Sequence, residues 1–166
     1  MGQQDECWVR VTRGLQRPLI RLAVSGTASC NNDESAFAGV AALATCCALL
    51  AEQAGCSLEV IGTIIVTDAL RGTLECGVVL PIKHADEAFH QNSMLSWGIP
   101  AVLRYYGFCA DHNLVTGKIN GLHGYAKPMT PALREHLNVQ HVLEVAWKND
   151  RQQMFLDEFV KTLQDA

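Results

Sequence analysis

The sequence contains no run of lysine or arginine, and only 18% of its 166 residues are charged. With a formal net charge of -4, the chain lacks the basic surface that attracts nucleic acids and anionic membranes. It also lacks a GxxxxGK[ST] or GxGxxG phosphate loop after the first expected strands, and a GxSxG nucleophile elbow. We therefore expect no nucleic-acid partner and no membrane partner. Without a phosphate-binding loop, the sequence also gives no local motif that indicates nucleotide binding.

A secretory signal is also missing from the first residues, because residues 1–14 are polar and charged. The longest apolar stretch, residues 36–50, is short for a bilayer span and follows acidic residues that favour the start of a buried helix. The seven cysteines are an odd number, and several lie inside apolar runs, as reduced cysteines in a cytosolic protein do. We expect a cytoplasmic location.

The pattern of apolar residues predicts strands and helices in an α/β order within one domain, residues 1–166. Strands are expected at residues 8–11, 18–24, 58–67, 73–83 and 141–147, and helices at 37–54, within 89–108, at 131–137 and from 149 or 150 onward. The helix at 37–54 is apolar nearly all round, so it should be sandwiched inside the fold or covered by a partner. Residues 109–131 are rich in glycine and proline, which indicates a long irregular connection.

The order of these elements predicts a parallel sheet with an antiparallel hairpin at its edge. The first strand, helix and second strand should form a right-handed crossover between parallel neighbours. The strand at 73–83 then folds back on 58–67, and Pro81 marks it as an edge strand. This arrangement resembles the von Willebrand factor type A domain, a Rossmann-like three-layer fold with helices on both faces of the sheet.

The resemblance implies a metal-ion-dependent adhesion site after the first strand, where the family has Asp-x-Ser-x-Ser. The matching residues here are Ser25, Thr27 and Ser29, which keep the hydroxyl spacing but replace the leading carboxylate with a serine. Neutral hydroxyls alone bind a hard cation such as Mg²⁺ weakly. We expect a degenerate, empty site with no cofactor; the alternative is that Asp68 or Asp86 supplies the missing carboxylate and Mg²⁺ binds.

A second, more local resemblance covers residues 81–108. This segment is similar to a recurrent segment of a von Willebrand A-like family of bacteriophage and bacterial proteins of unassigned function. The matching residues are Lys83, Asp86, Pro100, Leu103, Arg104 and Phe108. The resemblance implies a fold and a phage-type origin, in which case the protein is in the host cytoplasm or in a virion, and it implies no activity.

The densest polar cluster follows the strand at 73–83 and contains Lys83, His84 and Asp86. Strand ends are where α/β sheets present ligand-binding loops, so these residues are candidate binding residues. The other interpretation is a solvated connection between a strand and a helix. Tyr125 and Lys127 are candidates for an aromatic interaction surface together with the aromatic residues of 97–108, some of which core packing explains equally well.

Two further chemistries have weaker signals. Cys109 and His112 form a Cys-x-x-His pair, with Cys76, His84 and His90 elsewhere, but no second paired zinc motif completes four ligands. Cys30 precedes a helix N-terminus, where a thiol can be activated, but no base can be identified for it.

These patterns favour a non-enzymatic protein-association or assembly module that binds a protein partner or forms a homo-oligomer. The alternative is a small α/β enzyme, a hydrolase or transferase, whose site at the carboxyl ends of the strands is built from Ser25, Thr27, Ser29, Lys83 and Asp86. A third hypothesis is an adhesion module that has kept its cation. It differs from the first only in losing its binding in the presence of a chelator.

Overall fold

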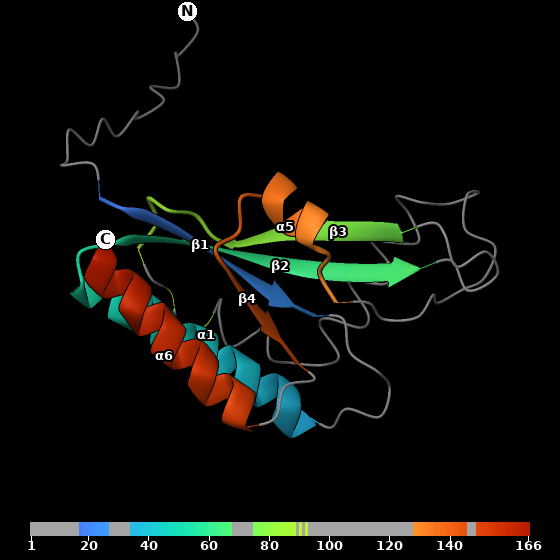
Figure 1. Ribbon diagram of the computed structural model, residues 1–166, viewed down its shortest axis with the longest axis horizontal. Coiled ribbons are helices and arrows are strands. Elements are labelled where there is room, and N and C mark those ends of the chain that lie inside the picture. Colours follow the sequence, from blue (N-terminus) through green and yellow to red (C-terminus); the bar gives the residue numbers. More distant parts are fainter. Residues whose placement is uncertain are drawn as a thin grey trace, which may run out of the picture.

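The computed structural model describes residues 17–26, 34–67, 75–88, 90, 92, 128–145 and 149–166. These residues form a mixed α/β fold (Figure 1). In chain order the elements are β1 (Leu19–Ser25), α1 (Glu34–Gln53), β2 (Ser57–Thr67), β3 (Glu75–Lys83), α5 (Pro131–His136), β4 (His141–Glu144) and α6 (Asn149–Asp165). The α/β class predicted from the sequence is confirmed.

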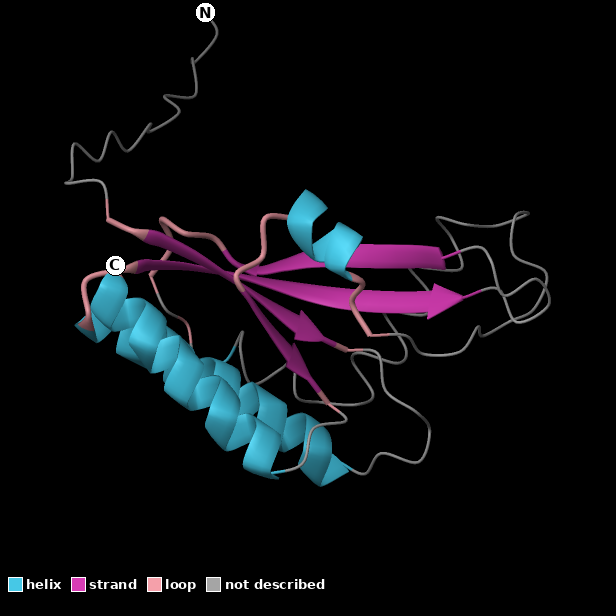
Figure 2. Cartoon of the chain, in the orientation of Figure 1, coloured by secondary structure: helices cyan, strands magenta, loops and turns pink. Residues whose placement is uncertain are grey.

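The four strands form one sheet in the order β3-β2-β1-β4 (Figure 2). β1 is parallel to both of its neighbours, β2 and β4. β3 is antiparallel to β2, and the register shifts between Val60 and Ile61, where Pro81 is paired with Ile61. The parallel pair and the antiparallel hairpin are therefore as predicted. Pro81 lies in an outer strand of the described sheet, the position in which proline is tolerated.

α1 and α6 cover one face of the sheet (Figure 1). Side chains alternate between the faces along a strand, so Ile20, Leu22 and Val24 of β1 all point toward these helices. They meet Phe37 and Val40 of α1 in a core that excludes water. The other fully buried members of this core are Ala44, Cys47, Ala48, Ala51, Cys56, Leu58, Val60, Leu143, Val145, Phe155 and Phe159.

The outward face of α1 is not covered by any element that the structure describes. Ala38, Ala42 and Cys46 are exposed along it, and the side chain of Leu49 is 44% exposed. The prediction that this helix is sandwiched inside the fold or covered by a partner is met on the sheet side among the described residues, and a partner on the outward face stays a prediction. The nearly uniform apolar composition of α1 identified a helix but did not tell which of its faces packs.

α1 is also long and apolar enough to cross a membrane, by length and composition alone. The segment concerned is Ser35–Gln53, of which 44% is buried inside the structure. The core helix of a soluble protein passes the same test. Its packing against β1 and β2 accounts for the apolar residues on its sheet-facing side.

α5 lies against the opposite face of the sheet (Figure 1). Thr130 caps it, with its hydroxyl accepting a hydrogen bond from the Leu133 N–H at 3.3 Å, and Pro131 occupies the first turn, where proline fits. Leu137 and Met129 at its two ends pack on a small core of Ala23, Ile61, Val139 and Val142. The short helix predicted over 131–137 is confirmed.

Three predicted features lie outside the described residues: the strand at 8–11, almost all of the helical segment within 89–108, and nearly all of the connection at 109–131. β4 ends at Glu144, three residues before the predicted end of that strand. α6 begins at Asn149, as its capping pattern predicts.

Phe159 anchors α6, so its truncation tests the packing of this helix on the sheet. Its side chain is 0% exposed and stacks on Phe155 with ring centroids 6.1 Å apart. We expect Phe159→Ala to lower the free energy of unfolding by about 3–5 kcal/mol, because it leaves a cavity that the core fills only in part. Urea denaturation measures this change. Lys161→Ala on the same helix is the control: its side chain is exposed and lies outside the core, and a change within about 0.5 kcal/mol is expected.

Candidate functional site

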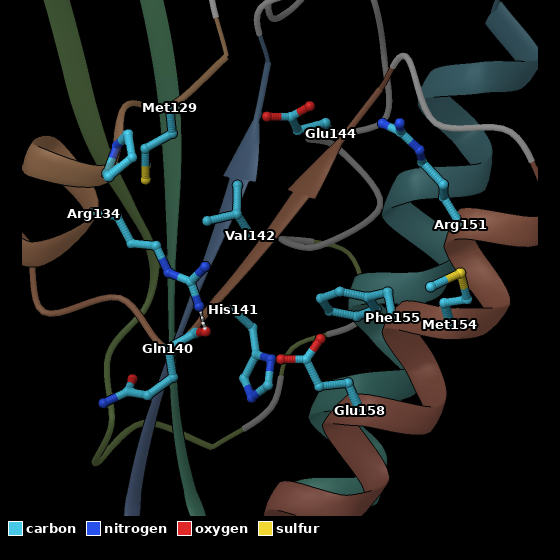
Figure 3. Close-up of a pocket in the computed structure, with 11 residues that line it drawn as sticks. Met129, Arg134, Gln140, His141, Val142, Glu144, Arg151, Met154, Phe155 and Glu158 are labelled. Carbon is cyan, nitrogen blue, oxygen red and sulfur yellow. Dashed lines mark hydrogen bonds between the residues drawn. The ribbon is translucent and has the colours of Figure 1, made fainter.

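A groove runs along the outer side of β4 (Figure 3). Its volume is about 510 Å³. β4 supplies its floor and α5 and α6 its two walls. Met129, Pro131 and Arg134 line the α5 wall, and Arg151, Met154, Phe155 and Glu158 line the α6 wall. Gln140, His141, Val142 and Glu144 line the floor.

The groove exists because β4 is an outer strand with a helix on each side of it. α5 precedes β4 in the chain and packs on one face, while α6 follows β4 and returns along the other face. Among the described residues, only β1 is paired with β4, so the opposite edge of β4 faces the groove. An outer strand of this kind presents backbone N–H and C=O groups that can pair with another strand.

Arg134 fastens α5 to the start of β4. Its Nε donates a hydrogen bond to the Val139 carbonyl at 3.0 Å, and its Nη2 donates to the Gln140 carbonyl. The side-chain oxygen of Gln140 in turn accepts from the backbone N–H of Arg21 in β1 at 2.7 Å. The wall and the floor of the groove are therefore joined by hydrogen bonds, which holds this end of the groove in one shape.

Arg21 reinforces the same junction from the middle of the sheet. Its Nη1 donates to the Leu137 carbonyl at 2.7 Å, and its Nε pairs with Glu59 of β2 at 2.6 Å. Both side chains of this ion pair are partly buried, at 28% and 20% exposure. One guanidinium thus connects β1, β2 and the end of α5.

His141 fastens β4 to α6. Its ring is 5% exposed and meets Phe155 and Phe159 edge-on, with centroid distances of 5.9 Å and 5.2 Å. The Thr162 hydroxyl donates its single hydrogen to the Glu158 carbonyl, so at 3.1 Å from His141 it accepts a hydrogen bond from the ring Nε2–H. This hydrogen bond therefore places a proton on Nε2 of His141.

Burial lowers the pKa of His141 below its ordinary value, since the apolar surroundings disfavour the charged ring. The nearby carboxylate of Glu158 acts in the opposite direction, and Arg134 lowers the pKa further. A neutral His141 adds no charge to the floor of the groove.

The groove carries balanced charge on its two walls and floor. Arg134 and Glu158 lie near the start of β4, and Glu144 and Arg151 lie near its end (Figure 3). Met154 lies between them on α6, with 70% of its side chain exposed. This combination of alternating charges and an exposed apolar side chain suits a polypeptide more than a nucleic acid.

Ser25, the first of the expected metal-site residues, lies at the carboxyl end of β1. It is 1% exposed and is paired in register with Thr63 of β2 and Glu144 of β4. The Thr63 hydroxyl is fully buried and has no hydrogen-bond partner. Thr27, Ser29 and Asp68 lie outside the described residues.

Glu144 is the carboxylate that the sequence analysis missed at this end of the sheet. It lies at the end of β4, in the same row across the sheet as Ser25 and Thr63. The sequence did not indicate this position, because it depends on the pairing of β4 with β1. Within the described ranges, no group of three or more His, Cys, Asp or Glu side chains is placed to hold a metal ion.

The Lys83 cluster does not join this row. Because β3 is antiparallel, its end lies toward the amino ends of the parallel strands, and Lys83 is paired with Val60, about 10 Å along the sheet from Thr63. His84 and Asp86 continue away from that point as exposed residues. The alternative that builds one enzyme site from Ser25, Lys83 and Asp86 is therefore wrong for these three residues, because the antiparallel course of β3 places its end toward the amino ends of the parallel strands.

Lys83 is buried and hydrogen-bonded to the backbone at the end of β3. It is 5% exposed, and its Nζ donates to the carbonyls of Leu58 at 2.9 Å and His84 at 3.1 Å. Burial lowers its pKa, against the opposing charges of the carboxylates of Glu52, Glu87 and Asp86. Tyr125 and Lys127, the other candidate binding residues, lie outside the described residues.

The cysteines that the structure describes form no reactive site. Cys47 and Cys56 are buried, Cys46 is exposed, and burial raises the pKa of Cys47 to about 12. Cys76 and His84 lie at opposite ends of β3, too far apart for two ligands of one zinc ion. Cys30, Cys109 and His112 lie outside the described residues.

Comparison with known proteins finds no matching family model, no matching curated protein and no matching solved structure.

The buried state of His141 predicts a pH dependence of stability. A lowered pKa in the folded chain means that the unfolded chain takes up a proton first as the pH falls, so the stabilisation is complete above the ordinary pKa of 6.5 and is lost below it. We expect the His141 ring to titrate below its ordinary pKa of 6.5 when followed by NMR. Titration of this ring at or above 6.5 would contradict the buried neutral ring.

Proposed function

We propose that this chain is a non-enzymatic protein-association module, similar to a von Willebrand A domain with a degenerate metal site, and that it binds through the groove along β4. The observation that carries this proposal is the outer edge of β4, flanked by α5 and α6 and lined by balanced charges. A strand added to such an edge gains main-chain hydrogen bonds for affinity, while the groove walls select its side chains.

The sheet order supports the von Willebrand A-like assignment. An antiparallel edge strand follows directly from the second parallel strand, and β1 lies between β2 and β4 with parallel pairing on both sides. Of the residues on which the resemblance to the phage and bacterial family depends, Lys83 ends β3 and Asp86 follows it, and the other four lie outside the described residues. A phage-encoded assembly protein of the host cytoplasm or of the virion fits this proposal.

The chemistry around Ser25 supports an association that needs no metal. Among the described residues, two hydroxyls and one carboxylate share the row at the carboxyl ends of the strands, fewer charged oxygens than a hard cation prefers. Neither Lys83 nor Asp86 reaches this row, so the charged groups of the expected enzyme site are absent from it among the described residues.

One observation favours a second candidate function, a small hydrolase or transferase with its site at the strand ends. The Thr63 hydroxyl is buried without a partner next to Ser25 and in the same row as Glu144. Buried polar groups without a hydrogen-bond partner are rare, and an unplaced ligand, ion or water is a common reason for one. A cation or a substrate oxygen at this row would provide one.

Affinity purification with a groove variant tests the proposed function. The tagged chain is purified from its native host with and without EDTA, and the eluate is analysed by mass spectrometry and light scattering. Met154→Asp places a charge in the groove on a side chain that is already 70% exposed, so folding should not suffer. We expect recovery of a stoichiometric partner or of an oligomer to fall by about tenfold or more, since a charge at a contact centre remains unpaired.

Leu49→Asp is the matched control, because it makes the same kind of change on the outward face of α1. Binding that survives Leu49→Asp and EDTA but not Met154→Asp supports the proposal. Loss in EDTA alone would move the function to the row of Ser25 and Thr63. Loss with Leu49→Asp alone would place the association on α1 and contradict the groove.

A further inference from the structure

We propose that the groove along β4 binds a second copy of this chain, with the two β4 strands antiparallel across a twofold axis perpendicular to the sheet. This inference rests on the proposed function, since it names the occupant of the same groove. The pairing joins two four-stranded sheets into one continuous sheet, with α1 and α6 of both copies on one face and both α5 helices on the other.

The heights of the charged groups along β4 carry the inference. β4 spans three residue steps, about 10 Å. α6 returns along β4 in the opposite direction, and the seven residue steps from Arg151 to Glu158 also span about 10 Å. Arg151 therefore lies level with the end of β4 and Glu158 level with its start, as Figure 3 shows.

The α5 side of the groove has the reverse order of charge. Arg134 lies level with the start of β4, where it binds the carbonyls of Val139 and Gln140. Glu144 lies at the end of β4 and points to the α5 side, since it shares the parity of Val142, which packs there. Each side of the groove thus has one positive end and one negative end.

A twofold axis perpendicular to the sheet brings the start of one β4 to the end of the other and keeps the faces aligned. Arg134 then meets the partner subunit's Glu144, and Glu158 meets the partner subunit's Arg151. Each contact occurs twice, because a twofold interface uses the same patch on both copies. Each of the four charged side chains of the groove faces an opposite charge of the partner subunit in this arrangement.

Parallel pairing of two β4 edges needs a twofold axis along the strands, which turns the faces over and places α5 of one copy beside α6 of the other. Opposite charges meet in that arrangement as well, because Arg134 then faces the partner subunit's Glu158. The hydrogen bonds distinguish the two arrangements: a parallel ladder makes the two strands inequivalent, because only one of two facing residues forms the hydrogen bonds, whereas antiparallel pairs exchange them reciprocally. The reciprocal hydrogen bonds therefore favour the antiparallel arrangement, and the charges fit it.

Met154 supplies the apolar centre of the contact. It lies between Arg151 and Glu158 on α6, which places it near the twofold axis and opposite its own copy. Its side chain is the most exposed of the large apolar side chains in the described part of the chain. A pair of such side chains, surrounded by charge pairs, has the usual anatomy of an interface with an apolar core and a polar rim.

Charge exchange on α6 tests the inference. Arg151→Glu and Glu158→Arg each place like charges opposite one another at two symmetric contacts, and both side chains are exposed, so the monomer should fold normally. By sedimentation velocity over a range of concentrations, we expect each single variant to raise the dimer Kd by about tenfold or more. The double variant Arg151→Glu/Glu158→Arg restores opposite charges and should return the Kd to near the wild-type value.

Lys161→Glu, an exposed charge reversal on α6 outside the groove, is the matched control and should leave the Kd unchanged. A dimer that weakens equally in the single and double variants, or in none of them, would overturn the antiparallel pairing. A wild-type chain that stays monomeric at every concentration would also overturn it. If that monomer still captures a different protein in a manner sensitive to Met154→Asp, the proposed function stands and only the identity of the occupant is wrong.

Discussion

The structure depends on the position of β1, which pairs in parallel with β2 on one side and with β4 on the other. This central strand is too deeply placed to be accessible, with Leu22 and Ala23 fully buried. Among the described elements, β4 is therefore the outer strand at the parallel end of the sheet. An edge strand must be blocked, covered or paired, and β4 has no proline and no lysine that would block it.

The two helices that flank β4 turn this edge into a shaped site. Arg134 ties α5 to the residues just before the strand, and His141 ties the strand to Thr162 of α6. These contacts are hydrogen bonds between buried or partly buried groups, which hold the walls at one separation. A preformed groove loses less conformational entropy on binding than a mobile one, which favours association through the strand edge.

Most of the fold could be predicted from the sequence because each element carries a local signal. β2 alternates β-branched residues, Pro81 marks the outer strand, and acidic residues precede α1. The antiparallel course of β3 was predicted as well, from its short connection to β2. That course places Lys83 toward the amino ends of the parallel strands, so the enzyme alternative, which combined Lys83 with Ser25, was inconsistent with the predicted hairpin.

The groove could not be predicted in this way. Its charged residues come from three separate elements, and each one alone looks like an ordinary solvated side chain of a short helix, a strand end or an amphipathic helix. Arg151 and Glu158 are seven residues apart, which places them on one side of α6. Only the packing of α6 along β4 brings that side of the helix to the groove. The information lies in tertiary arrangement, not in any motif.

Hydrogen–deuterium exchange on the free chain and on the assembled species tests the central claim most directly. If association uses the edge of β4, the backbone amides of His141–Glu144 exchange more slowly in the assembly, because new interstrand hydrogen bonds protect them. The amides on the outward side of α1 keep their rates. Unchanged exchange in β4, with new protection on α1 or elsewhere, would contradict the account.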